Sequence, residues 1–122
     1  MLTDKTGAQV VVTEQPTERL YEISVADTRA GLTAYRDHRN PDAADGDPIE
    51  RVFFHTEVAE EFGGRGLASI LVAEAVAATR AAGLLIVGVC PLVAAFLDKH
   101  PEYDDIRRPA TPGLQSWLET QL

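Results

Sequence analysis

Three glycines lie within four positions of one another in Gly63-Gly64-Arg65-Gly66, directly before an apolar run with helical spacing. Glycine removes the Cβ clashes that restrict a backbone, so consecutive N–H groups of such a loop can converge on one point. The first N–H groups of a helix have no partner within the helix, and they carry the positive end of its dipole. The stretch is therefore a candidate cradle for a phosphate or pyrophosphate, with Arg65 able to add a charged contact. The alternative is an ordinary flexible turn.

Three further residues have side chains that are candidates for chemistry. His55 and Glu57 are two positions apart in a strand-like run, so both side chains share one face, and either could act as a base. Exposed polar pairs without a catalytic role are also common on strands. Cys90, which carries the one thiol of the chain, precedes Pro91 at the start of an expected helix. Its alternative role is that of a small apolar residue at the end of a buried strand.

The elements around the glycines predict a strand-helix-strand unit. The run from Ile49 to Val58 is strand-like, and apolar residues then recur at helical spacing from about Gly66 to Ala82, with Gly83 placed to end the helix. Residues 84–89 are continuously apolar and predict a buried strand. A right-handed crossover would make the two strands parallel and place the glycine loop at the carboxyl end of a strand, where ligands usually bind in open α/β sheets.

The first third of the chain predicts strands without helices. The expected strands of this β-meander are Gln9–Glu14, Arg19–Val25 and Leu32–His38. The segment Asp27–Gly31 is expected to be a turn, and residues 39–48 predict an exposed loop because they contain two prolines, a glycine and three aspartates. Calcium binding by Asp42, Asp45 and Asp47 is an unfavoured alternative, since the ligand ladder of an EF-hand is missing.

The last third predicts two short helices. Pro91 suits the first position of a helix that covers Leu92 to Lys99, and His100 is expected to cap its end rather than to act in catalysis. Residues 109–113 predict a turn. Apolar residues including Trp117 then predict a helix at about 113–121 that docks through its indole.

The 122 residues predict one domain, residues 1–122, and their formal charge of −8 argues against binding to nucleic acid or anionic membranes. The one cysteine excludes an internal disulfide and a multi-cysteine zinc site, no metal is expected, and the cysteine fits a cytoplasmic location. The first residues lack the pattern of an export signal, and no apolar run approaches the length of a membrane span. The sequence does not specify an oligomeric state, and a monomer is compatible with it.

Two common nucleotide-binding patterns do not fit the glycine loop. A P-loop requires Gly-Lys-Ser/Thr, but Gly66 is followed by Leu67 and Ala68, so the hydroxyl that binds Mg²⁺ is missing. The dinucleotide fingerprint G-x-G-x-x-G, with its acidic residue about twenty positions later, is also absent. The anion is therefore expected to belong to a different class of ligand.

The residues do resemble the GNAT acyltransferase superfamily, whose acyl-CoA loop follows the pattern R/Q-x-x-G-x-G/A. The matching stretch is Gly63 to Ala68, with glycine at Gly63 where Arg or Gln is usual. The resemblance extends over roughly Arg19 to Tyr103, because three more motifs occur in order. These are His55-Thr56-Glu57-Val58, Cys90-Pro91-Leu92-Val93 and His100-Pro101-Glu102-Tyr103. The combination is similar to the small, single-domain GNAT-like proteins.

This resemblance implies a trimmed GNAT fold of the α+β / α/β class. It would have a mostly antiparallel sheet of about five strands, a β-α-β crossover and flanking helices. The implied cofactor is acetyl-CoA or coenzyme A, with the pantetheine arm against the backbone of Glu57 and Val58. The residues implied to bind the cofactor are Val58, Gly63, Gly64, Arg65, Gly66, Leu67, Ala68 and Ser69.

The implied function is N-acetyl transfer to an amine of a small molecule or peptide, with Cys90, Glu57 and His55 as the catalytic candidates. Transfer would be direct or would pass through an acetyl group on Cys90. Many members protonate the departing CoA thiolate with a tyrosine, and Phe96 occupies that neighbourhood. The alternatives are a non-catalytic CoA-binding or regulatory module, and a protein-interaction domain without a cofactor.

Overall fold

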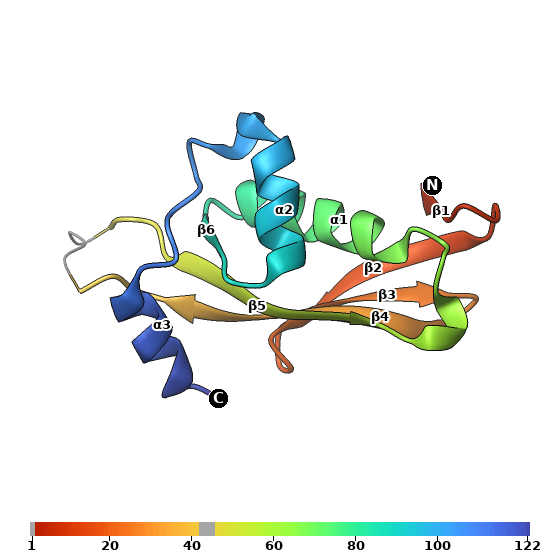
Figure 1. The fold of residues 1–122 in the computed structure, drawn as a ribbon, viewed down its shortest axis with the longest axis horizontal. Helices are drawn as coiled ribbons and strands as arrows, with labels where there is room; N and C mark the ends of the chain where they lie inside the picture. Colours follow the sequence, from red (N-terminus) through yellow and green to blue (C-terminus); the bar gives the residue numbers. More distant parts are fainter. Residues whose placement is uncertain (1, 42–45) are drawn as a thin grey trace.

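The computed structural model describes residues 2–41 and 46–122, which form one six-stranded sheet with helices on both faces (Figure 1). Its strands follow the chain order across the sheet and are β1 Leu2–Thr3, β2 Gln9–Gln15, β3 Leu20–Val25, β4 Thr28–His38, β5 Glu50–Val58 and β6 Leu85–Gly88. All neighbours are antiparallel except β5 and β6, which are parallel. The predicted fold class is confirmed. The additional strand is β1, whose Leu2 pairs with Val10 of β2.

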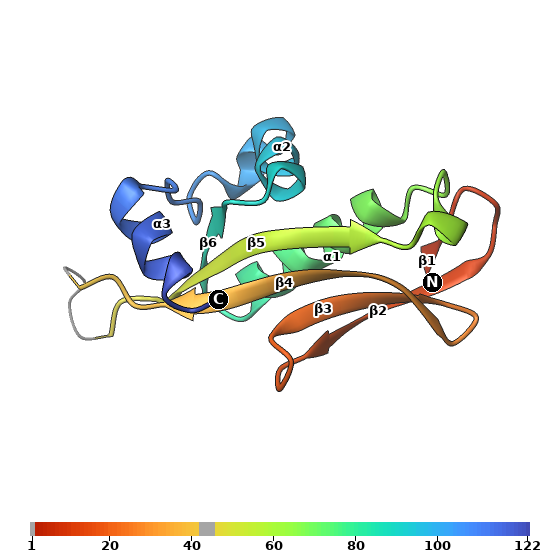
Figure 2. The same cartoon turned by 60° about the horizontal axis from the view of Figure 1, so that its bottom comes forward.

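The helices form two layers on opposite faces of the sheet (Figures 1 and 2). Helices α1 Leu67–Ala81 and α2 Pro91–Lys99 lie on one face, and α3 Pro112–Glu119 covers only one end of the other. Short 3₁₀ helices, Glu60–Phe62 and Pro101–Tyr103, precede α1 and follow α2. The parallel crossover predicted between β5 and β6 is confirmed. We call the part of the α3 face that α3 leaves uncovered the open face.

Two segments differ from their sequence-based predictions. The turn expected over Asp27–Gly31 is a two-residue hairpin turn formed by Ala26 and Asp27, with φ angles of 48° and 67°, so β4 already begins at Thr28. Two positive φ angles match the right-handed twist of the flanking strands. The last helix begins at Pro112, within the expected turn, because the Thr111 side chain accepts a hydrogen bond from the N–H of Leu114 and caps it.

Two hydrophobic cores hold these layers together. The larger lies between the sheet and helices α1 and α2, and includes the fully buried Ile23, Phe53 and Leu71. A smaller core under α3 consists of Val52, Val87, Leu114 and Leu118, with Phe54 and Trp117 packed against it. Among the described residues, no helix has the length and apolar character needed to cross a bilayer.

A β-bulge in β5 decides which side chains reach which face. Tyr35 pairs with Phe53 and the preceding Ala34 pairs with His55, so Phe54 is an extra residue in the strand. Phe53 belongs to the larger core and Phe54 packs on the smaller one. Beyond the bulge, Val58 again packs against the larger core, so His55 and Glu57, one residue out of phase with it, face the open side.

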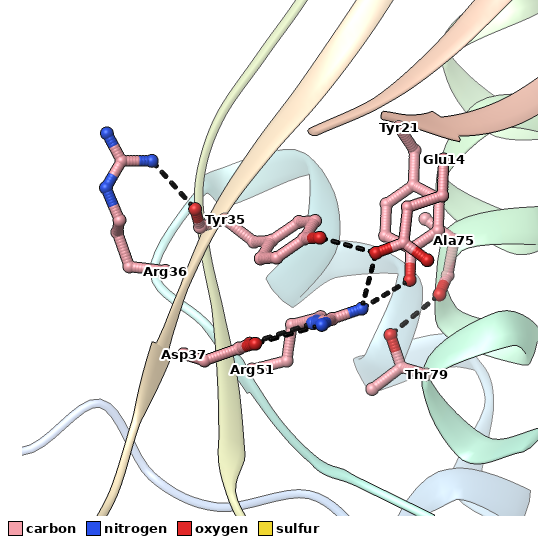
Figure 3. A network of polar contacts seen from close by, with 8 residues as sticks. All are labelled: Glu14, Tyr21, Tyr35, Arg36, Asp37, Arg51, Ala75 and Thr79. Atoms are coloured by element: carbon pink, nitrogen blue, oxygen red, sulfur yellow. Dashed lines mark hydrogen bonds and ion pairs between the residues drawn. The ribbon is translucent and has the colours of Figure 1, made fainter. Parts of the chain in front are cut away.

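A buried arginine ties four strands together at the start of β5 (Figure 3). Arg51 makes two hydrogen bonds to the carboxylate of Asp37, of 2.8 and 2.9 Å, and donates to Glu14 and to the Tyr21 hydroxyl. Its guanidinium lies 3.9 Å from the centre of the Tyr35 ring. Burial alone would lower the pKa of Arg51, but the hydrogen bonds to Asp37 raise it overall. Burial and a hydrogen bond to Glu14 raise the pKa of Tyr35.

Candidate functional site

The glycine loop leads directly into the start of α1. Gly64 and Gly66 have φ angles of 77° and 76°, and Gly66 is the N-cap of the helix. The first backbone donor into the helix is the N–H of Ile70, which bonds to the Gly66 carbonyl. Within the described parts of the chain, the backbone N–H groups from Gly64 to Ser69 donate no hydrogen bond to protein. Free N–H groups at a helix start fit a pyrophosphate.

Arg65 lies in this loop, but its charge is already partly compensated. Its guanidinium is 3.5 Å from Asp4 Oδ2 and stacks over the Phe62 ring at 5.2 Å. The Asp4 side chain is fully buried, and its Oδ1 accepts hydrogen bonds from Thr6 and from the N–H of Ala8. The segment before β2 therefore holds the glycine loop in place through the contact of Asp4 with Arg65. The sequence did not indicate this contact.

Replacing Asp4 with Asn should destabilise the protein at neutral pH but not in strong acid. The Thr6 hydroxyl holds the pKa of Asp4 below its ordinary value of 3.8 against the opposing effect of burial, with help from the Ala8 and Thr6 N–H groups and Arg65. A folded-state pKa below the unfolded value stabilises the fold above that value, and the gain is lost as the pH falls through the folded pKa. Urea unfolding should show the wild type more stable than Asp4→Asn at pH 7, and this difference should shrink as the pH falls below 3.8. A pH-independent difference would contradict this.

A groove of about 500 Å³ leads from the start of α1 along α2. Its lining residues are Ala68, Ser69, Ile70, Val72, Ala73, Leu92, Ala95, Phe96, Lys99 and His100. Phe96 stacks on the His100 ring at 3.9 Å, and His100 Nδ1 lies 2.8 Å from the Phe96 carbonyl oxygen. His100 therefore caps the end of α2, as predicted. The phenyl ring of Phe96 places no proton donor in the groove.

Strands β5 and β6 separate where β6 leads into α2, which lines this groove. β6 ends at Gly88, and the next two N–H groups, of Val89 and Cys90, both bond to the carbonyl of Phe53. β5 continues to Val58, paired only with β4 over the described residues. The edge of β5 from His55 to Val58 can therefore pair with an extended ligand arm.

Cys90 lies at the bottom of this separation and is only 4% exposed. Its thiol lies 3.3 Å from the Thr56 hydroxyl, which is 2.8 Å from the hydroxyl of the fully buried Thr33. These two threonines were not among the predicted site residues. The signal available was that Thr56 lies between His55 and Glu57, and so must face the opposite side of the strand.

His55 and Glu57 form a pair on the open face, with Nε2 3.1 Å from Oε2 and side chains 55% and 61% exposed. Their predicted shared face is confirmed. The structure does not bring them together with Cys90, because the backbone of β5 lies between. A hollow of about 320 Å³ lies beside Glu57 and is bordered by Arg29, Gly31 and Leu32.

Comparisons with known proteins identify the fold and the family of the chain. An NMR solution structure of a GCN5-like protein from Staphylococcus aureus is similar in fold, with a TM-score of 0.51 and 22% sequence identity over 84% of this chain and 91% of that chain. Comparison with curated proteins gave no match. A family model described as GCN5-related N-acetyl-transferase matches residues 20–106, which include β5, the glycine loop, α1, β6 and α2. The chain therefore belongs to the GCN5-related N-acetyltransferase, or GNAT, family.

Proposed function

We propose that the protein is a cytoplasmic acetyl-CoA-binding N-acetyltransferase that acts on an amine of a small molecule or peptide. The observation that carries the proposal is the row of unpartnered N–H groups from Gly64 to Ser69, whose last two residues, Ala68 and Ser69, also line the groove. The groove and the strand edge offer what an extended cofactor with a doubly charged pyrophosphate requires. The single cysteine, a free thiol, fits a reducing compartment.

The pyrophosphate and the pantetheine arm of the cofactor each have a matching group in the chain. The N–H groups from Gly64 to Ser69 would hold the pyrophosphate, and the edge of β5 near Glu57 and Val58 would pair with the pantetheine arm. Helices α1 and α2 would enclose the ligand on either side. The acetyl thioester supplies the activated acyl group, and it would lie where β5 and β6 separate.

The positions of the candidate bases favour direct transfer. The amine nitrogen forms the new bond to the acyl carbon as the carbon–sulfur bond breaks, and the amine must lose a proton. His55 and Glu57 are exposed on the open face, where an amine can approach, so they can accept that proton. Cys90 is buried and hydrogen-bonded to Thr56, which supports a role beside the thioester rather than as the nucleophile.

A non-catalytic CoA-binding module is the second candidate. It is favoured by one observation, that the groove-lining residue stacked on His100 is Phe96, whose side chain has no hydroxyl to protonate a departing thiolate. In the enzyme this proton would come from water or from the Cys90 thiol. The two candidates share a cofactor site and differ in turnover.

Calorimetry and an amine-acetylation assay test the proposal together. The protein should bind acetyl-CoA and CoA below about 1 mM, and Glu57→Gln should lower kcat about 100-fold without weakening CoA binding, since it removes the base and leaves the loop intact. Glu60→Gln, the same change in the exposed 3₁₀ helix, is the matched control and should leave kcat unchanged.

Three outcomes contradict parts of this scheme. No binding of either cofactor overturns the proposed function. Binding without transfer to any amine supports the non-catalytic module. An acetyl group found on Cys90 by mass spectrometry after mixing with acetyl-CoA alone, with loss of turnover in Cys90→Ala, would establish the covalent route instead of direct transfer.

A further inference from the structure

The segment between β1 and β2 lies against the glycine loop, as Figures 1 and 2 both show. The N–H of Lys5 donates a 3.0 Å hydrogen bond to the carbonyl of Arg65, and Asp4 pairs with the Arg65 guanidinium. This segment precedes residue 20, where the match to the family model begins. Its contacts with the loop are therefore a feature of this chain that the family match does not describe.

The side chain of Lys5 lies across Gly66. A methyl group built on Gly66 would come within 3.1 Å of Lys5 Cε, 3.4 Å of its Cγ and 3.6 Å of its Cδ. The ammonium group is bonded directly to Cε, so it is held beside the first turn of α1. Lys5 is exposed, and no ion pair to it occurs within residues 2–41 and 46–122.

The loop itself offers little uncompensated positive charge. Gly63 has no side chain, and Arg65 faces the buried Asp4 carboxylate, whose Oδ2 has no hydrogen-bond donor among the described residues. Moving Arg65 to a ligand would leave that carboxylate buried without its counter-ion, which is unfavourable. In a chain of net charge −8, a doubly charged pyrophosphate needs a cation nearby.

We propose that Lys5 supplies this cation and binds the pyrophosphate of acetyl-CoA together with the N–H groups of the loop. The proposal rests on the proposed function, because it concerns the same cofactor site. Arg65 and Asp4 are positioning residues, because their ion pair holds the segment that carries Lys5 against the glycine loop. An ammonium on a flexible stem is a common ligand for phosphate and needs no fixed bidentate geometry.

The competing explanation is that Lys5 only packs its methylene stem on Gly66 and leaves its charge in water. Lys5→Met separates the two, since methionine keeps an apolar stem of similar length without the charge. Lys5→Arg keeps a charge. Arg19→Gln removes one positive charge at the opposite end of β2, where Arg19 precedes β3, and controls for the change in net charge.

Calorimetry with three probes measures the effect of these variants. Lys5→Met should weaken CoA binding about fivefold to tenfold, and Lys5→Arg and Arg19→Gln should change it little. The same loss should appear with dephospho-CoA, which keeps the pyrophosphate but lacks the 3′-phosphate. Pantetheine, which has no phosphate, should bind the wild type and Lys5→Met equally.

The outcomes distinguish this proposal from the one on which it rests. Equal CoA affinity of the wild type and Lys5→Met overturns the role of Lys5 but does not contradict the proposed CoA site. A loss that is seen with CoA but not with dephospho-CoA assigns Lys5 to the 3′-phosphate and overturns the pyrophosphate contact. Absence of CoA binding by the wild type overturns both proposals.

Discussion

Replacing Arg51 with Ala should lower the free energy of unfolding by about 3 kcal/mol. The change removes a buried guanidinium that binds Asp37 through two hydrogen bonds and also donates to Glu14 and Tyr21. It also removes the stacking of this group on Tyr35. The remaining carboxylates are partly accessible, with side chains 40% and 35% exposed, so water will recover part of the loss. Urea unfolding at neutral pH measures the difference.

Arg36 provides the matched control for this prediction. It lies on the neighbouring strand, and Figure 3 shows it on the far side of the backbone from Arg51. Its side chain donates to the Tyr35 carbonyl and lies over the Phe54 ring. Arg36→Ala should therefore lower stability by about 1 kcal/mol or less. Similar losses in the two variants would show that the cluster around Arg51 adds no more than one peripheral arginine does.

Replacing Gly66 with Val should weaken CoA binding at least about tenfold, which is the largest effect expected on the cofactor site. At a φ of 76° a β-branched residue is strained, and its Cβ would lie 3.1 Å from Lys5 Cε. The exposed Lys5 side chain can move aside, but the strained φ favours a shift of the loop at its unpartnered N–H groups. Calorimetry with CoA measures the affinity, and urea unfolding measures the accompanying loss of stability.

Gly83 provides a control that separates the effect of backbone strain from the effect on the CoA site. It follows the other end of α1 with a φ of 74°, and a methyl group built there would contact nothing within 4 Å. Gly83→Val should cost about as much stability as Gly66→Val, about 1–2 kcal/mol, and should bind CoA like the wild type. Weaker binding by both variants to the same degree would mean that the effect comes from general destabilisation and not from the loop.

The strand-loop-helix-strand unit could be predicted from the sequence because its signals are local. Helical spacing after Gly66, a glycine at position 83 and a continuous apolar run at 84–89 each indicate one element, and their order indicates the parallel crossover. The boundaries of α1 lie within one residue of those expected. The hairpin turn was misplaced because a positive φ at Ala26 is not indicated by its residue type.

The parts of the candidate site that could not be predicted depend on contacts between distant segments. Alternation places His55 and Glu57 on a common face but does not specify which one, since the answer depends on the extra residue Phe54. The contact of Lys5 with the glycine loop joins residues about sixty positions apart, and no local pattern reports it. Cys90 and Thr56 meet for the same reason.

The bulge at Phe54 also affects how two substrates could share this small protein. It turns Thr56, whose hydroxyl contacts the Cys90 thiol, toward the helices. It turns the pair of His55 and Glu57 toward the open face. In the proposed reaction the cofactor would enter between α1 and α2, and the amine would arrive from the other side of the sheet. The site would then have two separate entrances, so neither partner would obstruct the path of the other and both could be bound at once.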